Sequence, residues 1–126
     1  MMRVGFDYWQ VISHYPTEMG QLCDALHEQG WDVHVISAIG KNRVGTIADD
    51  VHQHWPTFPK QRIHEVIFTN GTKSSPAIKL AKCKELGITM FFDDRKDVCE
   101  LLSANGILAF QVPRKGAGTD IGAERV

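Results

Sequence analysis

Residues 75–94 read SPAIKLAKCKELGITMFFDD, and this stretch decides the fold. Its first half begins with serine followed by proline, which is typical of a helix start, and Gly87 is placed to end that helix. Residues 88–92 are apolar and β-prone, a pattern that indicates a buried strand. Asp93 and Asp94 follow directly. A helix that leads into a buried strand with an acidic end predicts one unit of a parallel α/β sheet.

The same alternation continues on both sides of this stretch. Apolar runs predict four more strands, at residues 4–6, 33–36, 65–69 and 107–112. Apolar residues at helical spacing predict three more helices, around residues 19–26, 44–55 and 98–102, besides the one that Ser75 caps and that runs to Leu86. Parallel strands joined by helices require right-handed crossovers and a sheet covered on both faces. We therefore expect a three-layer, Rossmann-like α/β domain.

Length and composition favour one globular domain. The chain has 126 residues, of which 43% are hydrophobic and 23% charged, values near the average for globular proteins. We expect residues 1–113 to form the core and residues 114–126, which are rich in glycine, to form a mobile tail. No apolar run approaches the roughly 20 residues that a membrane-spanning helix needs. Asp7 interrupts the N-terminal region where a signal peptide would be apolar, so we expect a cytoplasmic protein.

Charge and cysteine usage argue against several other functions. The net charge is −1, and the lysines and arginines are scattered along the chain, so non-specific binding to nucleic acid is not expected. Cys23, Cys83 and Cys99 lie far apart within helical patterns, which favours small core residues over a zinc site or a disulfide framework. His52 and His54 are two residues apart and would point in different directions on a helix.

The ends of the predicted strands carry polar residues. Asp7, Ser37 and the pair Asp93-Asp94 each end a predicted strand, and Lys79 lies in the first turn of the third predicted helix. In an open parallel sheet, ligands bind beyond the carboxyl ends of the strands. Three carboxylates at that edge would repel one another unless a cation lay between them, and carboxylate oxygens suit Mg²⁺. The sequence therefore predicts a Mg²⁺ site, with a hydroxyl and a lysine nearby for an anion.

Four segments, in this order, resemble the four motifs of the haloacid dehalogenase (HAD) superfamily. They are Val4-Gly5-Phe6-Asp7, Val33-His34-Val35-Ile36-Ser37, the stretch from Lys79 to Ile88, and Phe91-Phe92-Asp93-Asp94-Arg95. The resemblance covers residues 3–112. It implies a sheet with strand order 5-4-1-2-3 and a hydrolase of phosphatase type.

The resemblance also implies roles for single residues. Asp7 resembles the nucleophile that forms an aspartyl-phosphate in this superfamily. Ser37 resembles the hydroxyl that binds the phosphoryl oxygens, and Lys79 resembles the lysine that neutralises charge on the nucleophile and the phosphate. Asp93 and Asp94 resemble the acids that bind Mg²⁺. The ion would also contact Asp7 and the backbone carbonyl of residue 9, which is Trp9 here.

The first motif departs from the family's phosphatases. In these enzymes the motif reads Asp-x-Asp-Gly, and the second acid protonates the leaving oxygen. Here Trp9 stands in place of that acid and Gln10 in place of the glycine. An indole cannot shuttle protons near neutral pH, and losing general acid catalysis costs about 10²–10⁴ in rate. Trp9 could stack on a ring of the substrate or fill the gap that the aspartate leaves.

Three interpretations stay open. The chain could belong to a HAD branch with another residue at position 9, be a slow Mg²⁺-dependent phosphatase, or be a catalytically impaired Mg²⁺- and phosphate-binding protein that acts through a partner. No cap domain fits between the motifs, so the site would be open. An open site favours a large phosphorylated substrate, such as a nucleotide or a macromolecule, or closure by a second subunit in a homodimer. A receiver domain of a two-component system is disfavoured, because its acid pair follows the first strand and the pair here follows the fourth.

Overall fold

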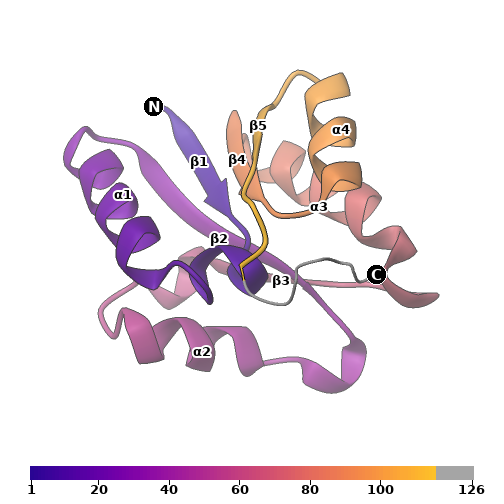
Figure 1. Cartoon of the computed structure of the whole chain (residues 1–126), viewed down its shortest axis with the longest axis horizontal. Helices are drawn as coiled ribbons and strands as arrows, with labels where there is room; N and C mark the ends of the chain where they lie inside the picture. Colours follow the sequence, from indigo (N-terminus) through magenta and orange to yellow (C-terminus); the bar gives the residue numbers. More distant parts are fainter. Residues whose placement is uncertain (116–126) are drawn as a thin grey trace.

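A five-stranded parallel sheet forms the middle layer of the molecule. The computed structural model describes residues 1–115 (Figure 1). The strands are β1 (Arg3–Phe6), β2 (Asp32–Ile39), β3 (Ile63–Ile67), β4 (Met90–Asp93) and β5 (Leu108–Gln111). They lie in the order β3-β2-β1-β4-β5 and all neighbours are parallel. This is the predicted order read from the other edge, so the predicted fold is confirmed.

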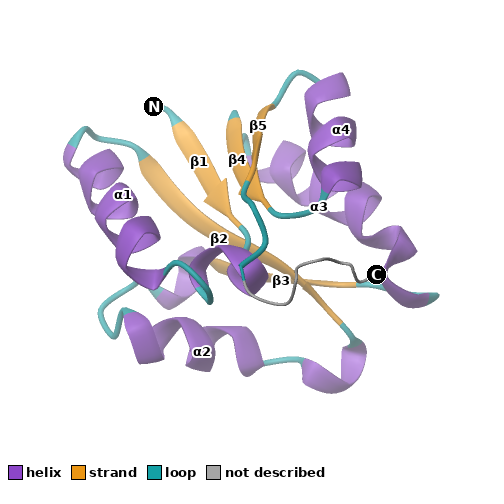
Figure 2. Cartoon of the chain, in the orientation of Figure 1, coloured by secondary structure: helices purple, strands orange, loops and turns teal. Residues whose placement is uncertain are grey.

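Helices cover both faces of the sheet (Figure 2). They are α1 (Pro16–Glu28), α2 (Thr46–His54), α3 (Ser75–Leu86) and α4 (Lys96–Ala104). Short helical turns lie at η1 (Tyr8–Ile12), η2 (Lys41–Arg43), η3 (Lys60–Arg62) and η4 (Gly71–Ser74). Among residues 1–115, no helix has the length and the apolar character needed to cross a membrane.

Each face of the sheet packs its own hydrophobic core, because side chains of a strand alternate between the two faces. Val33 and Val35 of β2 point toward α1 and α2, whereas Ile36, the residue after Val35, points toward α3 and α4. The first core contains, among others, Val4, Phe6, Ile47 and Val51. The second contains, among others, Cys83, Phe91, Val98 and Leu102. Cys23 is also buried, so all three cysteines are free thiols inside the protein, as the sequence indicated.

The structure corrects the bounds of β2 and β3. β2 runs three residues past the predicted end, so Ser37 lies within the strand, where its register partner is Glu65 of β3. β3 begins at Ile63, two residues before the predicted start. β3 also ends at Ile67, two residues before the predicted end, so it is shifted and not lengthened. Pairing with β3 extends β2, because each added residue satisfies further backbone groups. Tertiary pairing therefore outweighs the local pattern here.

The predicted N-cap at Ser75 is wrong. Ser75 is the buried first residue of α3, and Ser74 precedes the helix. The Ser74 hydroxyl donates to the carbonyl of Thr69 at 3.0 Å and caps no helical N–H. As a result, Lys79 lies one residue beyond the first turn of α3 rather than within it.

The segment after β5 does not begin as a free tail. The carbonyl of Pro113 accepts a hydrogen bond from the Tyr15 hydroxyl at 2.7 Å. Arg114 and Lys115 contact Asp94 and Gln10, respectively. The rest of the predicted mobile tail, residues 116–126, lies outside the residues that the structure describes.

Candidate functional site

The predicted acidic residues come together at the carboxyl edge of the sheet. Asp7 follows β1, Asp93 is the last residue of β4, and Asp94 is the next residue along the chain. One carboxylate oxygen of each lies within 4.8 Å of those of the other two, and all three side chains are buried. The backbone N–H of Asp7 donates to the carbonyl of Phe92 at 2.9 Å, which fixes the two strand ends together. This cluster could hold a metal ion.

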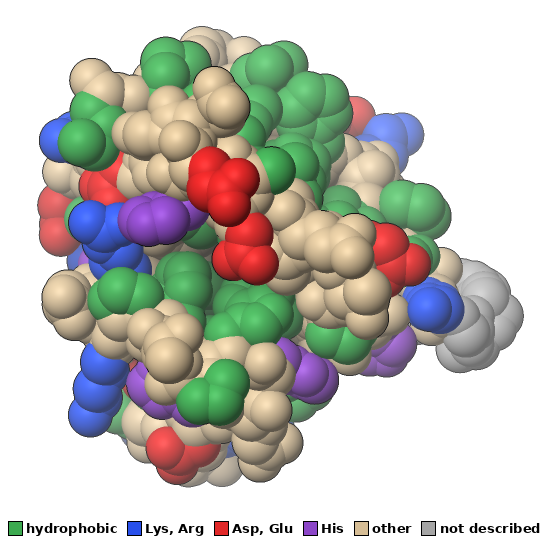
Figure 3. Space-filling model, turned by 90° about the vertical axis from the view of Figure 1, so that its left-hand side faces the viewer, with side chains coloured by type: hydrophobic (Ala, Val, Ile, Leu, Met, Phe, Trp, Pro, Cys, Tyr) green, Lys and Arg blue, Asp and Glu red, His purple; other side chains and the backbone are tan. Residues whose placement is uncertain are grey.

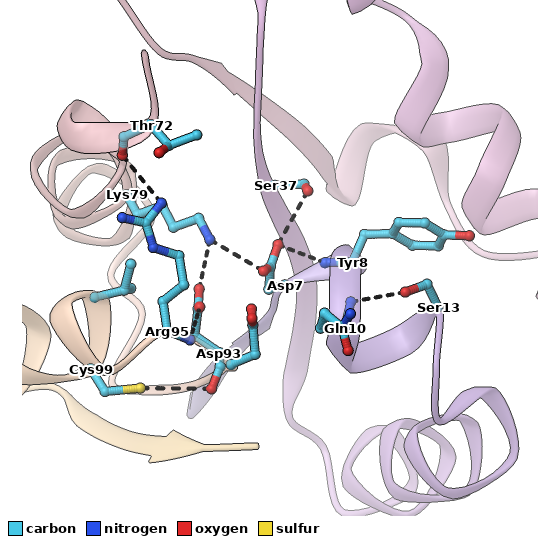
Figure 4. Close-up of polar contacts among 12 residues, drawn as sticks. Asp7, Tyr8, Gln10, Ser13, Ser37, Thr72, Lys79, Asp93, Arg95 and Cys99 are labelled. Carbon is cyan, nitrogen blue, oxygen red and sulfur yellow. Dashed lines mark hydrogen bonds and ion pairs between the residues drawn. The ribbon is translucent and has the colours of Figure 1, made fainter. Parts of the chain in front are cut away.

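Lys79 lies between two of the acids (Figure 4). Its Nζ is 2.6 Å from Oδ2 of Asp93 and 3.3 Å from Oδ2 of Asp7. The lysine is 2% exposed, so both ion pairs are shielded from water. In such surroundings an ion pair is much stronger than at the surface, but each charge also loses more hydration.

Ser37 reaches the same site from β2. Its hydroxyl donates to Oδ1 of Asp7 at 3.2 Å, and the backbone N–H of Tyr8 donates to the same oxygen at 2.8 Å. Because Lys79 faces Oδ2, each oxygen of the Asp7 carboxylate has its own partners. Ser37 can take this place although it lies within a strand, because β2 runs beside β1 and continues beyond its end.

Burial dominates the electrostatics of the cluster. It raises the pKa of Asp7 to about 8, with help from the carboxylates of Asp93 and Asp94 and against the lowering effect of Lys79. Burial also raises the pKa of Asp93, against the lowering effect of Lys79. For Lys79, burial would lower the pKa, but the two carboxylates outweigh it and the net change is upward. The acids are thus short of positive charge even with the lysine present, which favours the uptake of a proton or of a cation.

Two arginines complete the surroundings of the acids, and neither contact was predicted from the sequence. The backbone N–H of Arg95 donates to Oδ1 of Asp93 at 2.9 Å, and its guanidinium reaches the carbonyl of Thr72 at 3.2 Å. The guanidinium Nε of Arg114 donates to Oδ2 of Asp94 at 2.8 Å. Arg95 follows the acid pair directly and could have been noticed. Arg114 could not, because it lies in a segment with the composition of a tail.

Trp9, two residues after Asp7 in the chain, lies at the surface and is not packed into a gap. It is 40% exposed, and the guanidinium of Arg43 lies over its ring at 5.7 Å. Gln10 has a φ of 66°, a conformation that glycine adopts at less cost. The sequence had placed Gln10 where the HAD phosphatases have glycine, so the unusual backbone fits that correspondence. The metal contact expected from the Trp9 backbone carbonyl stays a prediction.

A separate hollow lies on the α1 side of the molecule. Figure 3 shows hydrophobic side chains exposed there beside acidic and histidine side chains. The hollow has a volume of about 470 Å³ and is lined by parts of α1 and the segment after α2, including Trp55 and Phe58. None of its lining residues belongs to the acidic cluster. Charged groups with shifted pKa values mark the strand ends as the stronger candidate for chemistry.

Comparison of the chain with protein-family models, with curated proteins and with solved structures gives no match. The function must therefore be inferred from the site. The site combines three buried carboxylates that could hold a metal ion with a buried lysine and a buried hydroxyl that both contact Asp7.

Proposed function

We propose that the protein is a HAD-like hydrolase, a Mg²⁺-dependent enzyme of phosphatase type that acts through an aspartyl-phosphate on Asp7. The observation that carries this proposal is the position of Lys79, whose Nζ bridges Asp7 and Asp93 at 3.3 and 2.6 Å. A buried lysine that contacts both a candidate nucleophile and a candidate metal ligand can also neutralise a phosphoryl group that enters between them.

The donor set fits Mg²⁺. The ion prefers a few carboxylate oxygens and retains several waters, and the oxygens of Asp7, Asp93 and Asp94 lie close enough to serve as such ligands. Burial first, and the neighbouring carboxylates of Asp93 and Asp94 second, raise the pKa of Asp7 against the lowering effect of Lys79. Mg²⁺ bound there would keep Asp7 ionised at neutral pH and would offset negative charge on the phosphoryl group.

The chain's own residues suit a two-step transfer. In the first step a carboxylate oxygen of Asp7 attacks phosphorus, and the bond between phosphorus and the ester oxygen breaks. Lys79 and the Ser37 hydroxyl, which contact Asp7 at 3.3 and 3.2 Å, would hold the phosphoryl oxygens at that moment. In the second step water attacks the same phosphorus, which releases inorganic phosphate and restores the Asp7 carboxylate. No cap domain is inserted between the described strands, which are joined only by helices and short turns, so we expect a nucleotide or a phosphorylated macromolecule as the substrate.

Trp9 limits the first step. The leaving oxygen needs a proton, and the indole at this position has none to give near neutral pH. The proton would have to come from water, so we expect turnover about 10²–10⁴ below that of a site with a general acid. Good leaving groups, which need no protonation, should suffer least.

A second candidate function is a binding protein that has kept the Mg²⁺ and phosphate site but not turnover, and that acts through a partner. The loss of the acid at position 9 and the exposed indole, with Arg43 over it, favour this alternative. An exposed aromatic ring two residues from Asp7 in the chain offers a contact for a bound ligand or a partner, which catalysis does not require.

Phosphate release from a panel of phosphomonoesters and nucleotides, with and without Mg²⁺, distinguishes the two functions. The control is Asp7→Asn, which keeps the shape of the side chain and removes the nucleophile. Mg²⁺-dependent turnover that disappears in Asp7→Asn supports the enzyme. Mg²⁺ binding without any turnover supports the binding protein.

The variant Trp9→Asp tests the missing acid. If Asp7 is a nucleophile that lacks only a proton donor, this substitution should raise turnover of substrates with poor leaving groups. Trp9→Asn is the matched control, because asparagine has the size of aspartate but cannot donate an acidic proton. An equal gain in both variants would mean that access, and not proton donation, limits the reaction.

A further inference from the structure

The segment that follows β5 crosses the edge of the acidic cluster. It consists of Pro113, Arg114 and Lys115, and we call it the C-terminal strap. The Tyr15 hydroxyl donates to the Pro113 carbonyl at 2.7 Å, and the Lys115 backbone N–H donates to Oε1 of Gln10 at 3.3 Å. The strap therefore joins the end of β5 to the turn that carries Trp9 and to the start of α1, as the path of the chain in Figure 1 shows.

Arg114 is the residue of the strap that touches the acids. Its Nε lies 2.8 Å from Oδ2 of Asp94, a carboxylate whose side chain is 4% exposed while the arginine side chain is 40% exposed. Asp94 is thus a buried acid held by a cation that comes from the surface. The same Asp94 offers a carboxylate oxygen to the cluster that could hold a metal ion.

The charges in the site make two cations at Asp94 unfavourable. Three carboxylates face the ammonium of Lys79 and the guanidinium of Arg114. A divalent cation bound by Asp94 would lie close to the Arg114 guanidinium, and the two like charges would repel each other across a carboxylate that is itself buried. Lys79 has two other acids as partners, whereas Asp94 is the partner that the structure shows for the Arg114 side chain.

We infer that Arg114 competes with the divalent cation for Asp94, so that cation binding loosens the C-terminal strap. This inference rests on the proposed function, because it concerns the same metal site. It assigns Arg114 as a positioning residue that holds Asp94 while no divalent cation is bound. The strap would then be held against Asp94 when the metal site is empty and released when a divalent cation is bound.

The first test measures Mg²⁺ affinity by calorimetric titration in the wild type, Arg114→Gln and Lys115→Gln. Lys115→Gln is the matched control, since it removes a neighbouring strap cation that contacts the His14 carbonyl and the Tyr15 ring but no acid of the cluster. We expect Arg114→Gln to bind Mg²⁺ roughly two- to fivefold more tightly, the range for one partly exposed ion pair, and Lys115→Gln to match the wild type. Equal or weaker binding by Arg114→Gln would overturn the inference.

The second test follows the strap directly by limited proteolysis with trypsin, which cleaves after arginine and lysine. Mg²⁺ should accelerate cleavage after Arg114 in the wild type. In Asp94→Asn, cleavage there should be fast and independent of Mg²⁺. If Mg²⁺ slows this cleavage in the wild type, the strap closes on the cation and the inference is wrong.

The two tests separate this inference from the proposed function. Absence of Mg²⁺ binding in every variant would remove both the metal site and the competition. Mg²⁺ binding with Asp7-dependent turnover, but with no gain in affinity in Arg114→Gln, would remove only the role of Arg114.

Discussion

Lys79 is the residue on which the site's charge balance depends most. It is 2% exposed and forms the ion pairs that hold Asp7 and Asp93 together. Removing one partner of a buried ionic cluster leaves the other charges without compensation, at a cost of about 3–5 kcal/mol. We expect Lys79→Met to lower the free energy of unfolding by about that amount in urea denaturation without Mg²⁺.

Lys82→Met, on the same helix, is the matched control for this prediction. Lys82 pairs with the exposed Glu85 at 3.1 Å, and exposed pairs contribute about 0–1 kcal/mol. Addition of Mg²⁺ should restore part of the stability of Lys79→Met, because a cation can replace the lost ammonium. Similar losses in the two variants would show that the buried contacts carry no special weight.

Asp7 makes the stability of the metal-free protein depend on pH. Its pKa rises from the ordinary value of 3.8 to about 8, so between these values the folded state binds a proton that the unfolded state has lost. Protonation of Asp7 therefore contributes to the free energy of unfolding. This contribution is fully present below pH 3.8 and is lost as the pH rises through about 8. For one proton, the free energy of unfolding changes by at most about 1.4 kcal/mol per pH unit.

Asp7→Asn should therefore flatten the dependence of stability on pH between 5 and 8 and make the metal-free protein more stable at the upper end. Urea denaturation at several pH values, with a chelator present, measures both effects. If the wild type were as stable at pH 8 as at pH 5, the carboxyl of Asp7 would already be ionised in the folded protein.

At the level of single residues, the sequence predicted the main site residues, and the structure brings Asp7, Ser37, Lys79 and the acid pair together. Their convergence was predictable because the ends of parallel strands meet at one edge of the sheet. The contact of Arg114 with Asp94 was not, since it joins residues 20 positions apart through the path of a loop. Hydrophobic periodicity predicts helices and strands but not the course of a loop.

At the scale of single elements, β1 and β4 depend on the absence of a side chain at position 5. A Cβ built on Gly5 would lie 2.5 Å from a ring carbon of Phe91, closer than real Cβ atoms come. Phe91 is fully buried and cannot move aside freely. Gly5→Ala should destabilise the protein by about 1–3 kcal/mol, the usual cost of overpacking a core, as measured by thermal unfolding.

Phe91→Leu combined with Gly5→Ala tests the cause. A smaller side chain at position 91 gives the new methyl group room, so the double variant should lose less stability than the two single losses added together. Additive losses would place the strain in the backbone of β1 instead.

The elements were predictable in kind and order but less so in their bounds. Apolar runs and helical spacings revealed every strand and α-helix of residues 1–115, because both patterns arise from local burial. The start of α2 was missed. It lies at Thr46, after Gly45 with a φ of 94°, and Glu65 of β3 accepts hydrogen bonds from the N–H groups of Gly45 and Ile47 at 2.8 and 3.1 Å. A cap supplied by a distant strand leaves no local signal.

For the molecule as a whole, the decisive property is the linkage between Mg²⁺ and folding. An ion that binds the assembled cluster of Asp7, Asp93 and Asp94, and not the unfolded chain, stabilises the folded state by mass action. For a Kd of about 1 mM, about 10 mM Mg²⁺ adds ~1.4 kcal/mol, which for a chain of this size corresponds to a rise in Tm of roughly 5 °C. The rise should be larger at pH 8 than at pH 6, because protons compete for Asp7, whose pKa is about 8.

Thermal unfolding of the wild type, Asp93→Asn and Asp24→Asn, each with Mg²⁺ and with a chelator, checks this prediction. Asp93→Asn should abolish the rise in Tm, since Asp93 is fully buried between the other acids and the lysine. Asp24→Asn removes an exposed acid of α1 and should leave the rise intact, because an exposed lone carboxylate holds Mg²⁺ only weakly. An equal rise in all three proteins would mean that Mg²⁺ acts on the general surface charge. The strand ends would then form a structural ion cluster, with Lys79 as its permanent cation.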